Sequence, residues 1–310
     1  MTYEKKLVAI GRSRFLYDSI KYLVGRGFQF KAIITEEAYE EYDVKAQDFE
    51  ALAAEIGATI FVTKNVMQEE LFNLLHEYGI RLAVSVNWKY TLPLDFLNRF
   101  ECGILNFHLG NLPDYKGNAT VNWSIINGED HIYGNIHRME AELDVGDVLS
   151  RKSIPITSET YVGDILKQAE KEAPALFEIA IETAMSQPGF YMVKGLKQGL
   201  RCYPRLPEDN QINWQESIET ICRLIRASSR PYQGAFSNLD GKKVIIWKAN
   251  KLIPTEKYLA IPGHVVALNK DTNTVWVACR DGFLEVLEIE VDGRVMAPFD
   301  YIKSIRTRFK

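Results

Sequence analysis

Short runs of β-branched and apolar residues alternate with stretches of helical periodicity through the first half of the chain. The apolar runs are LVAIG, FKAIIT, TIFVT, RLAVSV and GILNFH, and the stretches between them include YDSIKYLVGRG, AQDFEALAAEIG and MQEELFNLLHEYG. Strands alternating with helices of roughly 10–15 residues predict parallel βαβ units and an α/β, doubly wound sheet. Ligands of such sheets bind beyond the carboxyl ends of the strands, which is where the polar NFH triplet of GILNFH falls.

The pattern changes in the second half. GNIHRM and VLSRKSIPI predict two further strands, and a helix is expected from about Tyr161 to Met185. After a segment rich in Gly, Pro and charge, one helix (WQESIETICRLIRAS) precedes short strand-like pieces separated by the turn signals LDGKK, NKDTN, RDG and VDG. The sequence therefore predicts a Rossmann-like, mostly parallel sheet domain over 1–190, a linker over 191–211 and a small OB-like β-barrel over 212–310.

Length, charge and cysteine content narrow the class of protein. A chain of 310 residues is long enough for two domains, and the formal net charge of -4 gives no general attraction to nucleic acid. No apolar run approaches the roughly 20 residues of a membrane span, and the N-terminus does not resemble a signal peptide. Four cysteines are widely spaced and form no C-x-x-C pair. These features predict a cytoplasmic protein with reduced core thiols and no membrane partner.

Several motifs that would carry other chemistry are missing from the sequence. GRSRFL after the first strand holds one glycine where a dinucleotide-binding loop has G-x-G-x-x-G, and neither a P-loop nor a G-x-S-x-G elbow occurs. The five histidines show no metal-ligand spacing such as H-E-x-x-H, so no metal is expected. A dehydrogenase, a P-loop NTPase and a zinc hydrolase are therefore disfavoured.

Asn106 and His108 are the first candidate catalytic residues. Positions two apart on a strand share a face, so both side chains leave the sheet together at its end. An amide and an imidazole can both donate hydrogen bonds to a developing oxyanion, which suits acyl transfer without a covalent enzyme intermediate. The alternative is structural, with both residues capping the strand end.

A carboxylate motif follows in ELDVGDVL, where Asp144 and Asp147 flank Gly146. A loop carboxylate can orient an imidazole or take a proton through water, although Asp and Gly also favour ordinary turns.

The combination of N-x-H, L-P-x-x-x-G (Leu112 to Gly117) and L-D-x-G-D resembles the signature of the folate-dependent formyltransferase family. That family includes enzymes acting on methionyl-tRNA, glycinamide ribonucleotide and sugar amines. RLPEDNQINW and PGHVVAL are similar to the C-terminal domain shared by the methionyl-tRNA enzyme and the aminoarabinose-modifying enzyme.

The resemblance implies roles for individual residues. The family's catalytic Asn, His and Asp fall on Asn106, His108 and Asp144, and the formyl donor would be 10-formyltetrahydrofolate. The pterin pocket would be formed by two loops, whose matching residues here are Lys89, Tyr90, Thr91 and Leu92 in the first and Glu140, Glu142 and Leu143 in the second. Trp88 and Tyr90 are equally well explained as core aromatics.

An acceptor amine would then attack the formyl carbon while Asn106 and a protonated or neutral His108 bind the carbonyl oxygen. Asp144 would keep the imidazole protonated or relay the proton of the amine through water. The residues leave open which of His108 and Asp144 is the formal base.

The acceptor is less well defined than the reaction. HLGNLP departs from the family's frequent H-x-S-L-L-P at Gly110 and Asn111, which are candidate acceptor-side residues. VNWSIINGED and IHRM are more similar to the aminosugar enzymes, and the loop after LP carries few of the cations that a polyanion such as tRNA requires. Arg12 and Arg14 could hold a pyrophosphate or form a solvated pair. A nucleotide-linked amino sugar is the favoured acceptor, and methionyl-tRNA is the alternative. The alternatives to transfer are a non-catalytic protein that binds folate or sugar and a hydrolase of formyl-folate. The oligomeric state is not predicted by the sequence.

Overall fold

A computed structural model of the protein describes residues 5–37, 42–253 and 256–310. The chain divides into two compact units, each of which is described by itself. Unit 1 contains residues 1–120, 131–155 and 166–202, and unit 2 contains residues 121–130, 156–165 and 203–310. Over the described residues, no helix is both long enough and apolar enough to cross a membrane.

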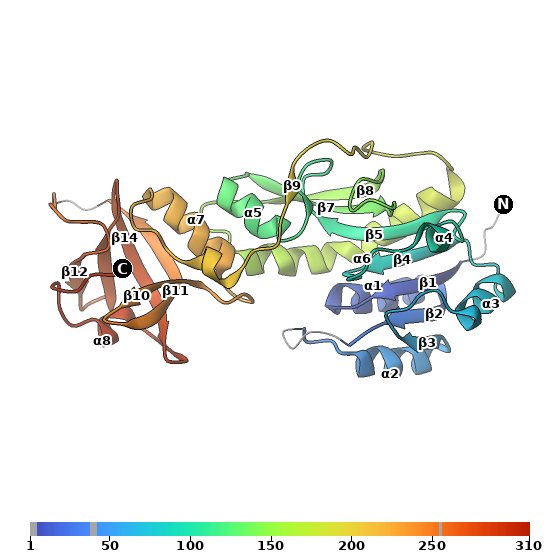
Figure 1. Ribbon diagram of the computed structural model, residues 1–310, viewed down its shortest axis with the longest axis horizontal. Coiled ribbons are helices and arrows are strands. Elements are labelled where there is room, and N and C mark those ends of the chain that lie inside the picture. The colour runs from blue at the N-terminus through green and yellow to red at the C-terminus, as the bar shows by residue number, and fades with distance from the viewer. Residues whose placement is uncertain (1–4, 38–41, 254–255) are drawn as a thin grey trace. The chain divides into compact units, whose positions relative to one another are not determined.

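Unit 1 is built on a seven-stranded sheet with the order β3-β2-β1-β4-β5-β7-β8 (Figure 1). The strands are β1 (Lys6–Gly11), β2 (Gln29–Thr35), β3 (Thr59–Val62), β4 (Leu82–Val86), β5 (Gly103–Leu109), β7 (His131–Arg138) and β8 (Val148–Pro155). The first five strands pair in parallel, whereas β7 is antiparallel to both β5 and β8. The prediction of a mostly parallel α/β sheet is confirmed.

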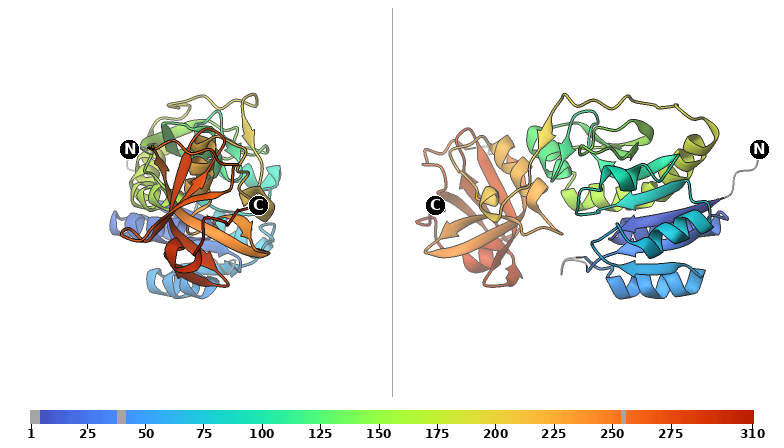
Figure 2. Two further views of the ribbon diagram at one scale, coloured as in Figure 1. Left: turned by 90° about the vertical axis from the view of Figure 1, so that its left-hand side faces the viewer. Right: turned by 45° about the vertical axis from the view of Figure 1, so that its right-hand side comes forward.

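Helices cover the sheet because their apolar residues recur at helical spacing. On α1 (Arg14–Gly25) the buried side chains are Leu16, Ser19, Ile20 and Leu23, which form one stripe. The other helices of this unit are α2 (Ala46–Ile56), α3 (Glu69–Glu77), α4 (Leu94–Leu97) and α6 (Val162–Ser186), and Figure 2 shows them along the sheet. The central strands are buried on both faces, as covered parallel sheets require.

The segment after α6 remains attached to unit 1. Within the predicted linker, β9 (Arg201–Cys202) pairs in parallel with β6 (Lys116–Gly117), and Met192 N–H donates to Val148 O. We call residues 192–202 the strap, and Figure 2 shows it as an extended trace following α6. Neither two-residue strand was predicted, because KG and RC carry no strand signal of their own.

Unit 2 contains an antiparallel sheet whose strands follow the order β10-β11-β14-β13-β12, with β15 paired to β14. Its elements are α5 (Thr120–Asn127), η1 (Pro207–Asn210), α7 (Ile218–Ser228), β10 (Ala235–Leu239), β11 (Lys242–Leu252), β12 (Val265–Asn269), β13 (Thr274–Ala278), β14 (Phe283–Val291), β15 (Arg294–Met296) and α8 (Pro298–Tyr301). The final segment joins the two sheet edges, since Phe309 N–H donates to Gly263 O and Lys310 N–H to Asn238 O. The sheet therefore closes on itself like a small barrel.

The core of unit 2 forms between this sheet and one face of α7. Ile221, Cys222 and Ile225 of α7 pack in one apolar cluster with strand residues such as Val244 and Leu284. The Arg226 guanidinium of the same helix donates to Thr157 O and Thr160 O, each at 2.9 Å. These bonds explain why residues 156–165, which include the first turn of α6, belong to unit 2.

Candidate active site

Asn106 and His108 lie near the end of β5, on a face shared with two polar residues of β7. Asn106 is the strand partner of Ser85 on β4 and of His137 on β7, and His108 is the partner of Asn135. Because residues two apart point to the same side of a sheet, Asn106, His108 and His137 belong to one polar cluster. The loops that follow β4 and β7 both begin close to the level of Asn106.

Each ring nitrogen of His108 faces an oxygen atom. The Nε2 atom lies 2.8 Å from the carbonyl oxygen of Tyr115, and the Nδ1 atom lies 3.5 Å from Asp144 Oδ2. His108 is only 8% exposed, and burial lowers the pKa of its imidazole, an effect that the Asp144 carboxylate opposes. In the neutral ring, the proton therefore belongs on Nε2, where it meets Tyr115 O, and Nδ1 is left to accept a proton.

Asp144 is held in a left-handed backbone conformation with φ of 56°. Its Oδ2 accepts the N–H of Gly117 at 2.8 Å, and its Oδ1 lies 3.4 Å from His137 Nε2. Burial alone would raise the pKa of this carboxyl. When the rings of His108 and His137 are protonated, their positive charge and the Gly117 N–H together outweigh burial and hold the pKa of Asp144 well below its usual range. Asp144 is therefore ionised at neutral pH.

His137 is a member of the cluster that the sequence analysis did not single out. Its Nδ1 lies 3.0 Å from Arg138 O and its Nε2 lies 3.1 Å from Asn106 Nδ2. A proton on Nδ1 leaves Nε2 to accept from the amide, which fixes the orientation of the Asn106 side chain. The available signal was the alternation of Asn135 and His137 in GNIHRM, which repeats that of Asn106 and His108.

Gly110 and Asn111 stabilise the loop beside His108. A Cβ atom at Gly110 would lie 2.4 Å from Tyr115 O and 2.5 Å from His108 Nε2, so a side chain there would disturb the bond between these two groups. The Asn111 amide donates to His131 O and accepts from Tyr133 N–H, both at 3.2 Å. Glycine at position 110 thus leaves room for the bond between Tyr115 O and His108 Nε2.

The first predicted pterin loop lies directly after β4. Lys89 and Thr91 are exposed, whereas Leu92 is buried in the apolar cluster against which Trp88 packs. The Tyr90 hydroxyl donates to Glu36 Oε2 at 2.8 Å, and its ring meets that of Trp88 edge-on.

The second predicted pterin loop lies between β7 and β8, and its Glu140, Glu142 and Leu143 are all exposed. It is attached to the strap by Arg201, whose guanidinium donates to Leu143 O at 3.2 Å and pairs with Glu142 at 3.3 Å.

Arg12 and Arg14 both face carboxylates in the structure. Arg12 is buried and lies 3.1 Å from Glu36, while Arg14 is partly exposed and makes two bonds to Asp43 Oδ2 at 3.0 and 2.8 Å. An anionic ligand at these arginines would therefore compete with carboxylates that are already present. Within the described residues, no group of three or more His, Cys, Asp or Glu side chains is arranged to hold a metal ion.

Comparison with known proteins shows the family of the chain. The family model described as formyl transferase matches residues 6–181, and the model for the formyl transferase C-terminal domain matches residues 206–306. The chain belongs to the formyl transferase family. The formyltransferase activity expected from the sequence motifs is thereby confirmed, and the two matched regions together account for most of the chain.

Relatives of this formyltransferase include a methionyl-tRNA enzyme and a protein crystallised with a nucleotide-linked amino sugar. The chain is 27% identical over 293 residues to the methionyl-tRNA formyltransferase of Geobacter metallireducens, covering 93% of this chain and 91% of the relative. The N-formyltransferase from Helicobacter canadensis, crystallised with folinic acid and dTDP-3-aminofucose, has the same fold at 17% identity (TM-score 0.63, covering 90% and 97% of the chains). HypX from Aquifex aeolicus in complex with tetrahydrofolic acid matches at 17% identity with a TM-score of 0.62. That match covers 97% of this chain but only 47% of HypX, so the chain spans about half the length of HypX.

Proposed function

We propose that this formyltransferase transfers the formyl group of 10-formyltetrahydrofolate to the primary amine of a nucleotide-linked amino sugar. The amine nitrogen forms a bond to the formyl carbon, the bond from that carbon to N10 of the folate breaks, and N10 takes up a proton. The amine loses one proton, so the reaction releases a formamide and tetrahydrofolate and needs no further reactant.

The observation that carries the proposal is the buried pair of His108 and an ionised Asp144 beside the oriented amide of Asn106. Neutral His108 accepts the amine proton at Nδ1, and Asp144 stabilises the resulting imidazolium from 3.5 Å away. An amide NH2 has two hydrogens, so the contact of Asn106 with His137 leaves one for the oxyanion that develops on the formyl oxygen. The same imidazolium then supplies the proton that N10 requires.

The two loops around the site suit a folate. The family resemblance implies that Lys89 to Leu92 and Glu140 to Leu143 contact the pterin largely through their main chain, and Trp88 and Tyr90 add aromatic surface beside it. Two relatives were crystallised with folates, namely folinic acid and tetrahydrofolic acid. These features support a folate as the formyl donor, with the loops as its walls.

A nucleotide-linked amino sugar is supported by the Helicobacter canadensis relative, which was crystallised with dTDP-3-aminofucose. Arg12 and Arg14 remain our candidates for its pyrophosphate, which would displace Glu36 and Asp43 from them. Gly110 and Asn111 would line the acceptor side through their main chain, since the Asn111 amide is already bonded within the loop.

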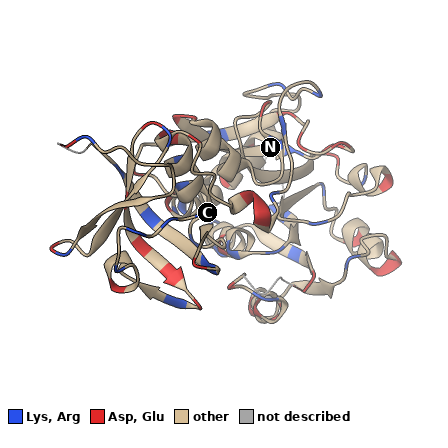
Figure 3. Ribbon diagram, turned by 60° about the vertical axis from the view of Figure 1, so that its left-hand side comes forward, with Lys and Arg blue, Asp and Glu red and all other residues tan. Residues whose placement is uncertain are grey.

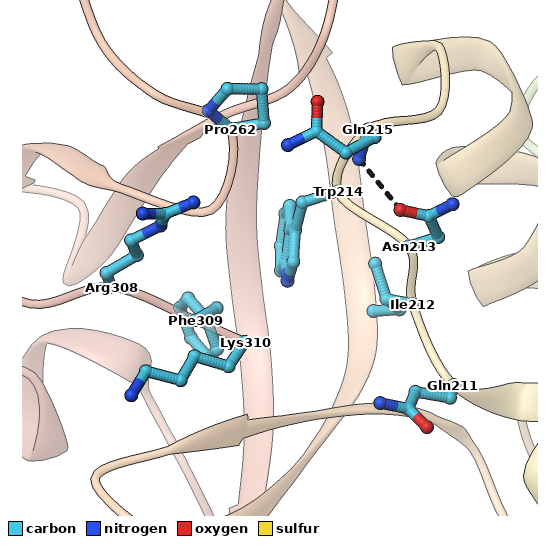
Figure 4. A pocket seen from close by; sticks show the side chains of 9 residues that line it. All are labelled: Gln211, Ile212, Asn213, Trp214, Gln215, Pro262, Arg308, Phe309 and Lys310. Atoms are coloured by element: carbon cyan, nitrogen blue, oxygen red, sulfur yellow. Dashed lines mark hydrogen bonds between the residues drawn. The ribbon is translucent and has the colours of Figure 1, made fainter.

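Methionyl-tRNA is the second candidate acceptor, favoured by the Geobacter metallireducens relative and by cations near the chain end. Arg308 and Lys310 line a groove of about 470 Å³ in unit 2, beside Trp214 (Figure 4). Elsewhere in this unit, basic and acidic positions are interspersed along the strands (Figure 3), and Lys242 and Lys248 pair with Asp292 and Glu288. A long tRNA needs many unpaired cations, which such pairing reduces.

A competition assay distinguishes the two acceptors. The purified protein and 10-formyltetrahydrofolate are incubated with methionyl-tRNA and a panel of nucleotide-linked amino sugars, and tetrahydrofolate release is followed spectroscopically. Formylation of a sugar with a kcat/KM at least about tenfold above that for methionyl-tRNA supports the proposal. Efficient formylation of methionyl-tRNA alone would refute the sugar assignment, and turnover of neither would refute both.

A further inference from the structure

Lys116 is a fully buried lysine whose partners are all main-chain oxygens. Its Nζ atom donates to Leu196 O at 2.9 Å, to Lys197 O at 2.9 Å and to Gln198 O at 2.6 Å. The side chain is 0% exposed. Lysines are almost never fully buried unless they are paired, because removing an ammonium group from water is costly. Three carbonyl oxygens match the three hydrogens of the ammonium group, so this position specifically suits a lysine.

The two neighbours of Lys116 support the catalytic pair through their main chain. Tyr115 O faces His108 Nε2 at 2.8 Å, and Gly117 N–H donates to Asp144 Oδ2 at 2.8 Å. These contacts select the tautomer of His108 and orient the carboxylate of Asp144. A shift of the Tyr115–Gly117 backbone would therefore change both members of the pair at once.

The strap that Lys116 binds is fixed at several other points of unit 1. Gly195 N–H donates to Asp147 Oδ1 at 2.8 Å, and Leu200 N–H donates to Asp114 Oδ1 at 2.7 Å. The Lys116 main chain also pairs with Arg201 in the short β6–β9 ladder. The Lys116 ammonium group thus connects the Tyr115–Gly117 backbone to the strap. The strap is itself anchored to unit 1, in part by Asp147, the second aspartate of the D-x-G-D motif.

We propose that Lys116 is a positioning residue, which locks the Tyr115–Gly117 backbone against the strap and thereby sets the geometry of His108 and Asp144. The expected effect of Lys116 on turnover rests on the proposed function, because His108 and Asp144 influence the rate only if they take part in formyl transfer. The positioning itself is independent of any substrate and can be measured without one.

Three variants separate positioning from a general effect on folding. Lys116→Met removes all three donors to the carbonyls of Leu196, Lys197 and Gln198, whereas Lys116→Arg keeps the charge and several donors. Lys197→Met is the matched control for the His108 spectrum and for kcat. It removes a lysine of the same strap whose side chain is 80% exposed and pairs at 3.7 Å with Glu142 of the second loop, and its carbonyl still accepts from Lys116. Circular dichroism and thermal unfolding give the folded fraction of each protein.

The first measurement is the imidazole ¹⁵N spectrum of the protein labelled at its five histidines, with the His108 signals assigned by their loss in His108→Ala. Wild type and Lys197→Met should show His108 as one Nε2-protonated form, and Lys116→Arg should retain most of it. Lys116→Met should show a mixture of tautomers. A wild-type His108 spectrum in folded Lys116→Met would overturn the positioning role.

The second measurement is steady-state kinetics, corrected for the folded fraction. We expect kcat to fall about 10²-fold in Lys116→Met, since small misplacements of catalytic groups have effects of that size, while KM for the folate changes by less than about threefold. The kcat of Lys116→Arg should lie no more than about tenfold below that of wild type, and Lys197→Met should keep the wild-type kcat. A loss that only follows the folded fraction would contradict the proposal. A wild type without formyl transfer would refute the proposed function, and the ¹⁵N experiment would still decide the positioning role.

Should Lys116→Met fail to fold, Asp114→Ala tests the same connection from an exposed residue. It removes the acceptor of Leu200 N–H and loosens the strap without leaving a buried charge. We expect the same change of the His108 spectrum at smaller amplitude, with kcat lowered several-fold. Identical spectra and kcat in wild type and Asp114→Ala would then overturn the role of the strap.

Discussion

The proposed catalytic cluster and the two loops predicted to bind folate are stabilised in different ways. His108, His137 and Asp144 are 8%, 1% and 7% exposed, and main-chain groups of Tyr115, Gly117 and Arg138 orient them. The loops instead expose most of their side chains and are attached through surface groups.

The attachments of the loops differ from those of the cluster. In the first loop Tyr90 donates to Glu36 and Leu92 is buried in an apolar cluster, and in the second Arg201 contacts Leu143 O and Glu142. A buried, main-chain-fixed cluster keeps reacting groups in one geometry, which catalysis requires. Exposed loops tolerate sequence change with little cost to folding. We therefore expect substitutions in the cluster to lower kcat and substitutions in the loops to alter KM.

His108→Ala should have the largest effect. It removes the group that accepts the amine proton, so kcat should fall about 10³- to 10⁴-fold, and Asp144→Ala should be similar because it leaves the imidazolium without its counter-charge. Formyl transfer is measured by tetrahydrofolate release. His76→Ala, an exposed histidine on α3, is the matched control and should keep wild-type turnover. Normal turnover in either cluster variant would remove the basis of the comparison.

Asn106→Ala should lower kcat about 10²- to 10³-fold, because it removes one donor to the developing oxyanion. His137→Ala should have a smaller effect, about tenfold, since His137 acts through the orientation of Asn106. The double variant should then be no slower than Asn106→Ala alone, which a double-mutant cycle of kcat measures. Additive losses would instead mean that His137 acts on the substrate or on Asp144 independently.

The pH profile tests the electrostatics of the cluster. Burial lowers the pKa of His108, so the neutral, proton-accepting ring should persist to more acidic pH than an exposed histidine would allow. The acid limb of kcat/KM should therefore lie below pH 6.5, with activity lost as the pH falls through that limb. Profiles measured with two acceptors of different amine pKa separate this limb from ionisation of the acceptor. An acid limb above pH 7 would contradict the assignment of neutral His108 as the base.

The same contrast explains which features could be predicted from the sequence. Local patterns predicted the strands of the sheet, the α7 helix and the strand end that carries Asn106 and His108, because periodicity and turn residues act over a few positions. The motif around Gly146 predicted Asp144, and the structure shows why a glycine follows it. A Cβ atom at position 146 would lie 1.7 Å from Arg138 O.

Long-range pairing could not be read from local pattern. His137 lies opposite Asn106 because β7 pairs antiparallel to β5, and its register with β8 contains an irregularity between Ile136 and His137. The two-residue strands β6 and β9 join positions about 85 residues apart, and Lys116 has its role only once they have paired. Register and short ladders depend on the assembled sheet rather than on local propensity.

Tyr90→Phe should have the smallest effect and tests the loop side of the comparison. The substitution keeps the ring beside Trp88 and removes only the hydroxyl that donates to Glu36, so the loop becomes less well ordered. We expect KM for 10-formyltetrahydrofolate to rise about three- to tenfold, as for the loss of one hydrogen bond, with kcat unchanged. Tyr17→Phe on α1 is the control and should leave both constants at their wild-type values. A fall in kcat at constant KM would instead show that Tyr90 affects the chemical step, as the buried cluster does. The distinction between a fixed cluster and adaptable loops would then not hold for this residue.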